Sequence, residues 1–464
     1  MPPHPMRDVI VLLPGITGSV LKKDGKVVWG FSPGTVMRAL FTGGHSITGA
    51  LEMGGDDPER DTLDDGVTAS ALIPDLHLIP GLWKIDGYSV VSDTIRRVFD
   101  VREGQNFFTF PYDWRRDNRA SARRLQRHAH DWLKAWRQQS PQAKLILIAH
   151  SMGGIVSRYF LDVLGGWQDT KALITFGTPY RGSLNALDTL SNGIRKGPLP
   201  LGHLTEFCRS CTSIYQLLPI YPAYSAGSGA LERVGEVSGI PGVDAAKAQA
   251  ALAFHREIIA AVDANLKDPK YMAERYRVFP SVGTMQPTLQ SARLDAGRVI
   301  LERHYDGSDM GGDGTVPGVS AIPHEYSKAE NAVYAAMKHG SLQNTVSLLD
   351  HVEGVVTSLD IDLGKFLAPD RRVQLSLQIE DAYFDDEPVV VGVDAGEDRL
   401  TLDATIEDAS TGRVVVTTAM RDRSDGTYSA DCGVLPEGSY RIRVGGDSGA
   451  VATVADSFGV APRG

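Results

Sequence analysis

This chain of 464 residues has little cysteine, no excess of basic charge and no long apolar run. Acidic residues outnumber basic ones by 57 to 47, which gives a formal net charge of −10 at pH 7. Nucleic-acid-binding proteins normally present a basic face, so we expect no nucleic-acid partner. No apolar run approaches the roughly 18 residues of a membrane-spanning helix, so we expect none. Three cysteines, a small and odd number, are typical of a reducing compartment.

The N-terminus also lacks the pattern of a secretory signal. Residues 7–15 already predict the first core strand and its turn, and little chain precedes them. We therefore expect a cytoplasmic location. Cys208 and Cys211 have the spacing of a redox or metal site, but no second Cys or His pair accompanies them. We interpret them as two thiols one helical turn apart.

Apolar runs and helical patterns alternate through most of the chain. The buried-strand candidates are Val9–Leu13, Phe107–Phe110, Leu145–Ala149, Ala172–Phe176 and Arg277–Val282. The helical patterns include Tyr88–Phe99, Arg119–Gln139, Gly154–Leu164, Ala245–Asn265 and Ala329–Lys338. Such alternation predicts a mostly parallel sheet with helices on both faces, and in such sheets the chemistry lies at the carboxyl ends of the strands.

Two insertions and a change of pattern set the domain organisation. Residues 22–87 and 183–275 follow core strands on the side of the expected site, so we predict that they form a lid or cap. From residue 369 onward, short stretches of alternating polarity separated by turns predict an all-β, immunoglobulin-like sandwich. The predicted units are therefore a catalytic domain over 1–368 and an accessory domain over 369–464, whose partner the sequence does not reveal.

The most specific feature is Ala-His-Ser-Met-Gly at 149–153. It follows an apolar strand and precedes a helical pattern, which is the arrangement of a nucleophile elbow with Ser151 at its tip. The strained turn requires small residues two before and two after the serine, and Ala149 and Gly153 satisfy this. The elbow presents the hydroxyl at a helix N-terminus, where unpaired N–H groups favour negative charge.

An activated serine needs a histidine base and an acid, which follow it along the chain in this kind of fold. Asp313 lies in the glycine-rich loop 311–317 and is the candidate acid, with Asp306 and Asp309 as competitors. His339 follows on a glycine-containing loop and is the candidate base. Its competitors are His324 and His351.

Two backbone groups are candidates for an oxyanion hole. The N–H of Met152 directly follows the nucleophile, and the N–H of Ile16 lies in the loop after the first strand. Thr17 could add a hydrogen bond, and Thr17 and Trp83 are the candidates for substrate contact. Such chemistry uses no cofactor and no metal.

Several motifs occur in a fixed order over about residues 8–360. They are Leu13–Ser19, Ile79–Leu82, Phe110–Arg115, Ala149–Gly154, Gly177–Ser183, Gly312–Val316 and His339. In these motifs the chain resembles the lecithin:cholesterol acyltransferase family, which includes lysosomal phospholipase A2 and the phospholipid:diacylglycerol acyltransferases. The resemblance implies an α/β-hydrolase fold, a triad of Ser151, Asp313 and His339, and acyl chemistry on lipids.

The chain departs from the family in two respects. No cysteine precedes Cys208, whereas family members outside the cytosol have a cysteine pair that pins a lid near the first strand. The C-terminal β-domain lies outside the family pattern.

Within the Pro-Tyr-Asp-Trp-Arg block, we expect Asp113 and Arg115 to hold a loop together, the alternative being substrate contact. The arginine-rich helix after it is expected to have a solvated basic side; peripheral contact with an anionic membrane is the alternative.

The sequence thus predicts a serine-dependent hydrolase or acyltransferase that acts on lipid esters through an acyl-enzyme. Two alternatives stay open: an esterase that acts on another lipid-linked ester, and a binding or adhesion protein that uses the hydrolase fold as a scaffold. Since every candidate catalytic residue precedes residue 368, we also expect residues 1–368 alone to hydrolyse a small ester.

Overall fold

The computed structural model describes most of the chain. The described residues are 2–30, 49, 51–74, 77–79, 83–196, 199–227, 229–326, 332–359, 373–446 and 451–463. The predicted domain boundary at 368 and much of the first predicted insertion lie outside them. None of the described helices is long and apolar enough to cross a membrane.

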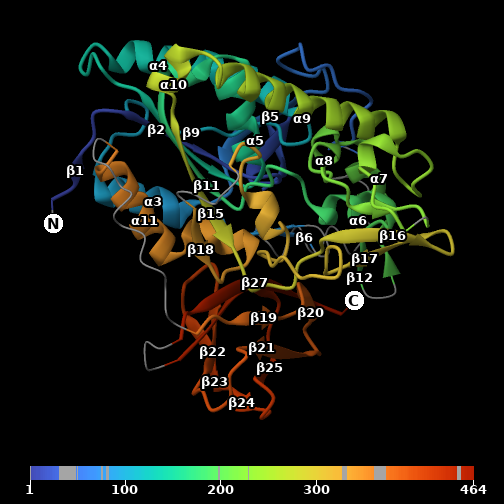
Figure 1. The fold of residues 1–464 in the computed structure, drawn as a ribbon. Helices are drawn as coiled ribbons and strands as arrows, with labels where there is room; N and C mark the ends of the chain where they lie inside the picture. Colours follow the sequence, from blue (N-terminus) through green and yellow to red (C-terminus); the bar gives the residue numbers. More distant parts are fainter. Residues whose placement is uncertain are drawn as a thin grey trace.

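A six-stranded parallel sheet forms the centre of the larger unit (Figure 1). Its strand order is β18-β15-β11-β10-β2-β9, and each neighbouring pair is parallel. The bounds are β2 Val9–Leu13, β9 Phe107–Thr109, β10 Leu145–His150, β11 Thr170–Phe176, β15 Arg277–Gly283 and β18 Val333–Ala335. β2 and β10 are buried at every position, as expected of parallel strands covered on both faces.

The two faces of the sheet pack against different helices. Val9, Val11 and Leu13 of β2 join one apolar cluster with α4 (Asn118–Trp136), α5 (Met152–Arg158) and α9 (Ala245–Asn265). Ile10 and Leu12 join a second cluster with α3 (Ser89–Val98) and α11 (Val346–Thr357). Because successive strand residues point to opposite faces, one strand supplies both cores. The α/β-hydrolase fold predicted from the sequence is confirmed.

Short elements surround the sheet. The other α-helices with described bounds are α6 Leu184–Ser191, α7 Gly202–Ser210, α8 Thr212–Tyr215 and α10 Pro269–Glu274, all within the second predicted insertion. The small sheets consist of β3 Ser19–Lys23 with β4 Lys26–Trp29 and β5 Val67–Leu72; β14 Tyr224–Ser225 with β16 Ser291–Asp295 and β17 Arg298–Glu302; β6 His77–Ile79 with β7 Trp83–Ile85; β12 Arg195–Lys196 with β13 Leu199–Pro200; and β1 His4–Pro5 with β8 Phe99–Asp100.

The C-terminal unit is a β-sandwich. In Figure 1 it lies below the larger unit that contains the six-stranded sheet, which we call the hydrolase unit. One sheet has the order β19-β21-β25-β24 (Ser376–Gln378, Pro388–Asp394, Thr427–Val434, Arg421–Asp422). The other has the order β20-β27-β26-β22-β23 (Ala382–Phe384, Val454–Ala461, Gly438–Gly445, Asp403–Asp408, Val414–Ala419). Strands of both sheets supply one shared apolar core. The pairs are antiparallel except β20 with β27.

One local prediction is wrong. Within the described part of the expected helix 329–338, residues 333–335 form strand β18 at the edge of the sheet, because pairing with β15 outweighs the local helix preference. The helix predicted after Ser151 is present, but it is not a regular α-helix throughout. It passes at Tyr159 into a π-helical turn that runs to Val163.

Candidate active site

Ser151 lies in the sharp turn between β10 and α5, as the elbow predicts. Its backbone has φ 50° and ψ −124°. Residues other than glycine rarely adopt this conformation. A Cβ at position 153 would lie 2.5 Å from the carbonyl oxygen of Pro14, which explains why Gly153 is required. The Ser151 N–H donates to the carbonyl of Phe176 at 2.8 Å. The side chain is only 4% exposed, whereas we expected an open hydroxyl.

Asp313 is fixed by hydrogen bonds to both of its carboxylate oxygens. Oδ1 accepts from the N–H groups of Thr315 at 2.9 Å and Val316 at 2.6 Å. Oδ2 lies 2.7 Å from Nδ1 of His339, and the aspartate is 1% exposed. The glycine-rich loop therefore aims one oxygen of a buried carboxylate at the histidine.

His339 completes a chain of hydrogen bonds to the serine. Its Nε2 lies 2.9 Å from Oγ of Ser151, and its backbone N–H donates to the carbonyl of Asp313 at 2.9 Å. Gly177, at φ 55°, leaves room for this pair. A Cβ there would lie 2.8 Å from Oδ2 of Asp313 and 2.9 Å from Nδ1 of His339. The structure thus brings all three predicted residues together.

The competing residues lie apart from this chain of hydrogen bonds. Asp309 Oδ1 accepts from the side chain of Gln290 and from the N–H of Gly311. His324 pairs with Glu325, and His351 lies within α11. Asp306 sits in a turn of positive φ. The hydrogen-bonded chain to Ser151 therefore consists of Asp313 and His339.

Sequence reasoning missed a second chain that links the serine turn to the histidine loop. The N–H of Gly15 donates to Oη of Tyr88 at 2.7 Å, and this hydroxyl lies 2.9 Å from Nδ1 of His150. Nε2 of His150 lies 3.1 Å from the carbonyl of His339, which can only accept, so the proton of His150 sits on Nε2. Tyr88 then donates to Nδ1. The serine's own neighbour therefore points away from Ser151 and ties the elbow to the loop of His339.

Burial keeps this second chain uncharged. Burial, and after it the charge of the neighbouring His339, lowers the pKa of His150 to about 3. Burial likewise raises the pKa of Tyr88, so its hydroxyl keeps its proton. A neutral imidazole and a neutral phenol thus link Gly15 to His339 through hydrogen bonds. Since Tyr88 lies outside the recognisable motifs of the site, no local pattern marks it.

The predicted oxyanion donors lie in buried backbone: Met152 directly follows Ser151, and Ile16 follows Gly15, where a Cβ would lie 2.9 Å from Cβ of Ser151. Met152 is the first residue of α5, so its N–H has no partner within the helix. Ile16 lies in the turn that the Gly18 N–H closes by donating to the carbonyl of Gly15, and Ile16 is 1% exposed. Thr17 in the same turn has φ 61°. Trp83 begins β7, but its side chain lies outside the described residues.

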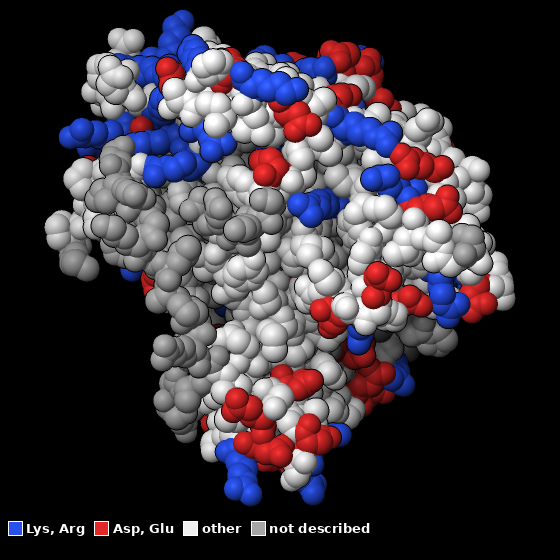
Figure 2. All heavy atoms as spheres, in the orientation of Figure 1, with Lys and Arg blue, Asp and Glu red and all other residues white. Residues whose placement is uncertain are grey.

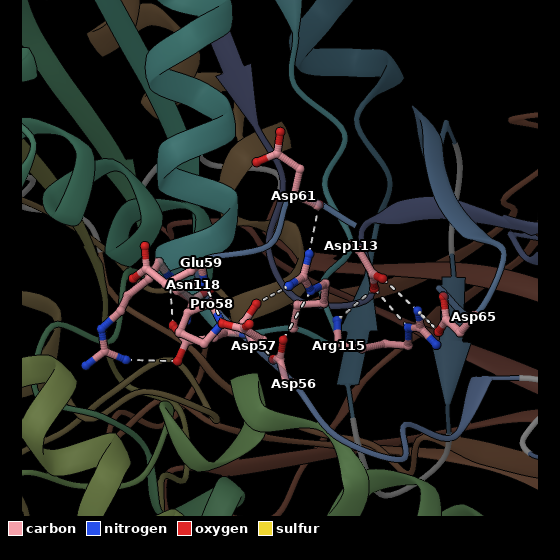
Figure 3. A network of polar contacts seen from close by, with 12 residues as sticks. Asp56, Asp57, Pro58, Glu59, Asp61, Asp65, Asp113, Arg115 and Asn118 are labelled. Carbon is pink, nitrogen blue, oxygen red and sulfur yellow. Dashed lines mark hydrogen bonds and ion pairs between the residues drawn. The ribbon is translucent and has the colours of Figure 1, made fainter. Parts of the chain in front are cut away.

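The Asp-Trp-Arg motif holds a loop in place, which agrees with the structural interpretation. Arg115 is fully buried and donates to both oxygens of Asp113 and to Asp65 (Figure 3). It also donates to the carbonyl of Leu51. Nε1 of Trp114 donates to the carbonyl of Ser19 at 3.3 Å. Arg115 therefore fastens the segment 51–65 to the end of β9.

The basic side of α4 is not simply solvated, so that expectation is wrong in part. Arg116, which just precedes the helix, binds Asp56 and the carbonyls of Asp57 and Asp61. Arg123 and Arg127 of the helix pair with Glu59 and Asp61. Figure 2 shows basic and acidic side chains interspersed over this upper part of the molecule. These arginines therefore form ion pairs with the acidic segment 56–65.

Neither the cysteines nor the acidic residues that the structure describes form a second reactive site or a metal site. Cys208, Cys211 and Cys432 are all free and buried. Burial raises the pKa of Cys211 to about 12, so this thiol stays protonated and unreactive. Within the described ranges, no group of His, Cys, Asp and Glu could hold a metal ion.

The geometry can therefore support one type of chemistry. A neutral imidazole with its Nδ1–H bonded to a carboxylate can accept the proton of a serine hydroxyl at Nε2. The serine oxygen is then a nucleophile beside N–H groups that can bind negative charge.

Comparison with known proteins agrees with this fold and these motifs. Residues 82–288 match the family model of lecithin:cholesterol acyltransferase. The resemblance predicted from the motifs is thus confirmed over this segment. No curated protein sequence matches the chain.

Two solved structures are similar to this chain at low sequence identity. A chain of the Tle4–Tli4 complex superposes with a TM-score of 0.50 at 14% identity, over 78% of this chain and 99% of that one. The mature lipase BlEst2 from Bacillus licheniformis gives a TM-score of 0.37 at 14% identity, over 76% of this chain and 94% of the lipase.

Proposed function

We propose that this protein is a serine-dependent acyl hydrolase or acyltransferase that acts on lipid esters through an acyl-enzyme. The observation that carries the proposal is the hydrogen-bonded chain from Asp313 through His339 to Ser151, with the serine at a strained elbow. The match to the acyltransferase family over residues 82–288 favours a lipid ester as the substrate.

The reaction begins at Nε2 of His339. As Oγ of Ser151 attacks the ester carbonyl carbon, its proton moves to this nitrogen, and Asp313 stabilises the imidazolium that forms. When the tetrahedral intermediate collapses, the bond to the alcohol oxygen breaks and the imidazolium returns the proton to the leaving alcohol. Water or a second alcohol then attacks the acyl-enzyme by the same route in reverse.

Ile16 and Met152 are the proposed oxyanion donors, and Thr17 a residue that contacts the substrate. The N–H groups of residues 16 and 152 lie on the two backbone segments that flank Ser151, where a carbonyl oxygen becomes negatively charged. Loss of one such donor typically costs about 10²- to 10³-fold in rate. A backbone N–H supplies this stabilisation whatever the acyl chain, so the donors do not select the substrate.

Hydrolysis and acyl transfer differ only in the acceptor. Ser151, Asp313 and His339 are each at most 5% exposed. This burial limits the access of water and of a bulkier alcohol alike, so it favours neither acceptor. Product analysis with and without an added long-chain alcohol distinguishes the two.

The decisive experiment replaces the nucleophile. Ser151→Ala should lower turnover of every ester by about 10⁴-fold or more, because no other group can form the acyl-enzyme. Labelling by a fluorophosphonate probe should also disappear, while thermal unfolding should change little. A phospholipid and neutral-lipid panel, read by mass spectrometry, then identifies the substrate.

Ser157→Ala is the matched control. Ser157 lies on the same helix, and its hydroxyl donates to the carbonyl of Gly153 at 2.8 Å, away from the histidine. This variant should keep both labelling and turnover. Ester turnover that survives in Ser151→Ala would show that the nucleophile is wrong. Labelling of the unaltered protein without turnover of any lipid would point to a different ester.

A further inference from the structure

The β-sandwich touches the two loops that carry Asp313 and His339. β27 is buried along its whole length, because it faces both the sandwich core and the hydrolase unit. Ala455 of this strand belongs to the same apolar cluster as Met337 and Leu342, which flank His339. Figure 1 shows β27 as the strand at the top of the sandwich, next to the hydrolase unit.

The first polar joint connects the sandwich to the His339 loop through Asp86. Nε of Arg441, on β26, lies 3.0 Å from both carboxylate oxygens of Asp86, and Nη2 lies 2.5 Å from Oδ1. The backbone N–H of Asp86 donates to the carbonyl of Gly340 at 2.9 Å. Its own carbonyl accepts from the side chain of Asn344 at 2.8 Å. One buried aspartate thus holds the residue after His339 and is itself held by the sandwich.

Arg441 is what makes a charged Asp86 tolerable at this depth. Burial raises the pKa of the Asp86 carboxyl, and the guanidinium opposes that shift. The Asp86 side chain is 4% exposed, so without Arg441 its carboxylate would lack its cationic partner in a nearly dry environment. The segment would then have to move or take up a proton.

The second polar joint connects the sandwich to the Asp313 loop through Gln286. Its backbone N–H donates to the carbonyl of Gly312 at 3.0 Å, directly beside the acid. Its side chain reaches the other way, with Nε2 donating to the carbonyl of Leu375 and Oε1 accepting from the N–H of Leu377, both at 3.1 Å. Gln286 is 3% exposed, so water cannot readily replace these bonds.

We propose that the C-terminal sandwich holds Asp313 and His339 in position. Arg441 of the sandwich and Gln286, which bonds to the sandwich from the larger unit, are the positioning residues. Arg441 acts through Asp86 on His339, and Gln286 acts through Gly312 on Asp313. Neither touches the reacting atoms. The inference rests on the proposed function, and it deepens it by assigning a catalytic consequence to the unit outside the family match.

The geometry explains why outside support matters. His339 must keep two hydrogen bonds of 2.7 and 2.9 Å at once, to Asp313 and to Ser151. Its loop follows β18, a three-residue strand at the edge of the sheet. A displacement of about 1 Å in such a constellation can cost about 100-fold in rate. Contacts from a second packed unit restrict that displacement.

The test compares two arginines of the same strand in the full chain. Arg441→Gln should lower kcat on a small water-soluble ester by about 10- to 100-fold with little change in KM, since positioning and not binding is lost. Arg443→Gln is the matched control, because Arg443 pairs with Glu407 inside the sandwich. It should change kcat by less than about twofold. A small ester removes any effect of binding to a lipid surface.

Two further variants separate positioning from a general loss of structure. Arg441→Lys keeps the charge but not the forked geometry, so it should restore kcat only in part. Asp86→Asn in the Arg441→Gln background removes the buried charge and should also recover part of the activity. The proton on Nδ1 of His339, observed by NMR, should shift in Arg441→Gln and stay unchanged in Arg443→Gln. If Arg441→Gln is too unstable to purify, Arg441→Lys and Gln286→Leu carry the same comparison.

The outcomes separate this inference from the proposed function. Equal kcat values for Arg441→Gln, Arg443→Gln and the unaltered chain would overturn the inference. So would a loss in Arg441→Gln that appears only in KM. Absence of any Ser151-dependent turnover in the unaltered chain would instead overturn the proposed function. If the inference holds, residues 1–368 alone lose activity on a small ester, contrary to the expectation from sequence.

Discussion

The two halves of the site are held by different means. Ser151 is fixed by the centre of the sheet: β10 ends at it, α5 begins after it, and its backbone bonds to Phe176 of the neighbouring strand. Asp313 and His339 lie on loops beyond the strands at one side of the sheet, β15 and β18, and are held by side chains from distant parts of the chain. The nucleophile is therefore encoded locally, and its partners are placed by tertiary contacts.

This difference has a physical reason. A strand, a tight turn and a helix can be specified by a few consecutive residues, because sheet pairing and helix hydrogen bonds determine the path between them. A loop without regular hydrogen bonds needs other partners, and here these are His150, Asp86 and Gln286. We expect changes in these partners to affect the acid–base half of the site while the elbow stays intact.

The largest expected effect is the loss of the acid–base half itself. His339→Ala and Asp313→Asn should each lower kcat by about 10⁴-fold, since the serine then lacks an oriented base. Steady-state kinetics on a small ester measures this. His351→Ala and Asp309→Asn are the controls and should change kcat less than about threefold. A larger loss in either control would mean that the wrong acid or base has been chosen.

The next effect concerns the pH dependence of stability, because His150 joins the two halves as a neutral group. Its folded-state pKa of about 3 lies below the ordinary value of about 6.5, so between these values the unfolded chain binds more protons. The free energy of unfolding therefore falls as the pH falls below about 6.5. Between pH 7 and pH 5 His150 should account for about 2 kcal/mol, at about 1.4 kcal/mol per pH unit.

Denaturant unfolding at pH 7 and pH 5 tests this. In His150→Gln the dependence on pH should be weaker by that amount, since an amide can replace the hydrogen bonds without titrating. His255→Gln is a matched comparison outside the site, because burial lowers the pKa of His255 to about 4 and its Nε2 bonds to the carbonyl of Gln216. It should weaken the pH dependence similarly but leave kcat unchanged. An unchanged pH dependence in His150→Gln would contradict a neutral buried His150.

The smallest expected effect tests the second hydrogen-bonded chain. Tyr88→Phe leaves the N–H of Gly15 and Nδ1 of His150 without the hydroxyl between them. We expect kcat to fall by about 10-fold and the free energy of unfolding by about 1–3 kcal/mol. Tyr221→Phe removes a comparable bond to the carbonyl of Gln290 outside the site and should affect stability alone. Equal kcat values for the two variants would remove Tyr88 from the positioning network.

The same contrast explains which parts of the structure could be predicted from the sequence. β2 and α9 have the predicted bounds, since each is a contiguous pattern of apolar spacing. Ser151, Asp313 and His339 could be named because they occur in the order that this fold requires. In the sandwich, alternating polarity predicted the kind of element, and β25 shows that alternation in its burial. The helix predicted at 329–338 failed because sheet pairing at β18 outweighed helix propensity.

Tyr88, Asp86, Gln286 and Arg441 could not have been found in the same way. Asp86 and Arg441 are 355 positions apart, and nothing in either neighbourhood suggests a partner. Only the folded chain brings a sandwich strand against the histidine loop.

The Asp86–Arg441 joint also constrains how this protein can change over generations. A buried carboxylate and the guanidinium that neutralises it cannot be replaced one at a time without an unpaired charge in between. Substitutions at 86 and 441 are therefore expected to occur together among descendants of this chain, and Gln286 to vary with the backbone path at 375–377. Exchanging the C-terminal unit between two homologues at residue 372 would separate these partners. A working chimera has to inherit position 86 from the same parent as position 441.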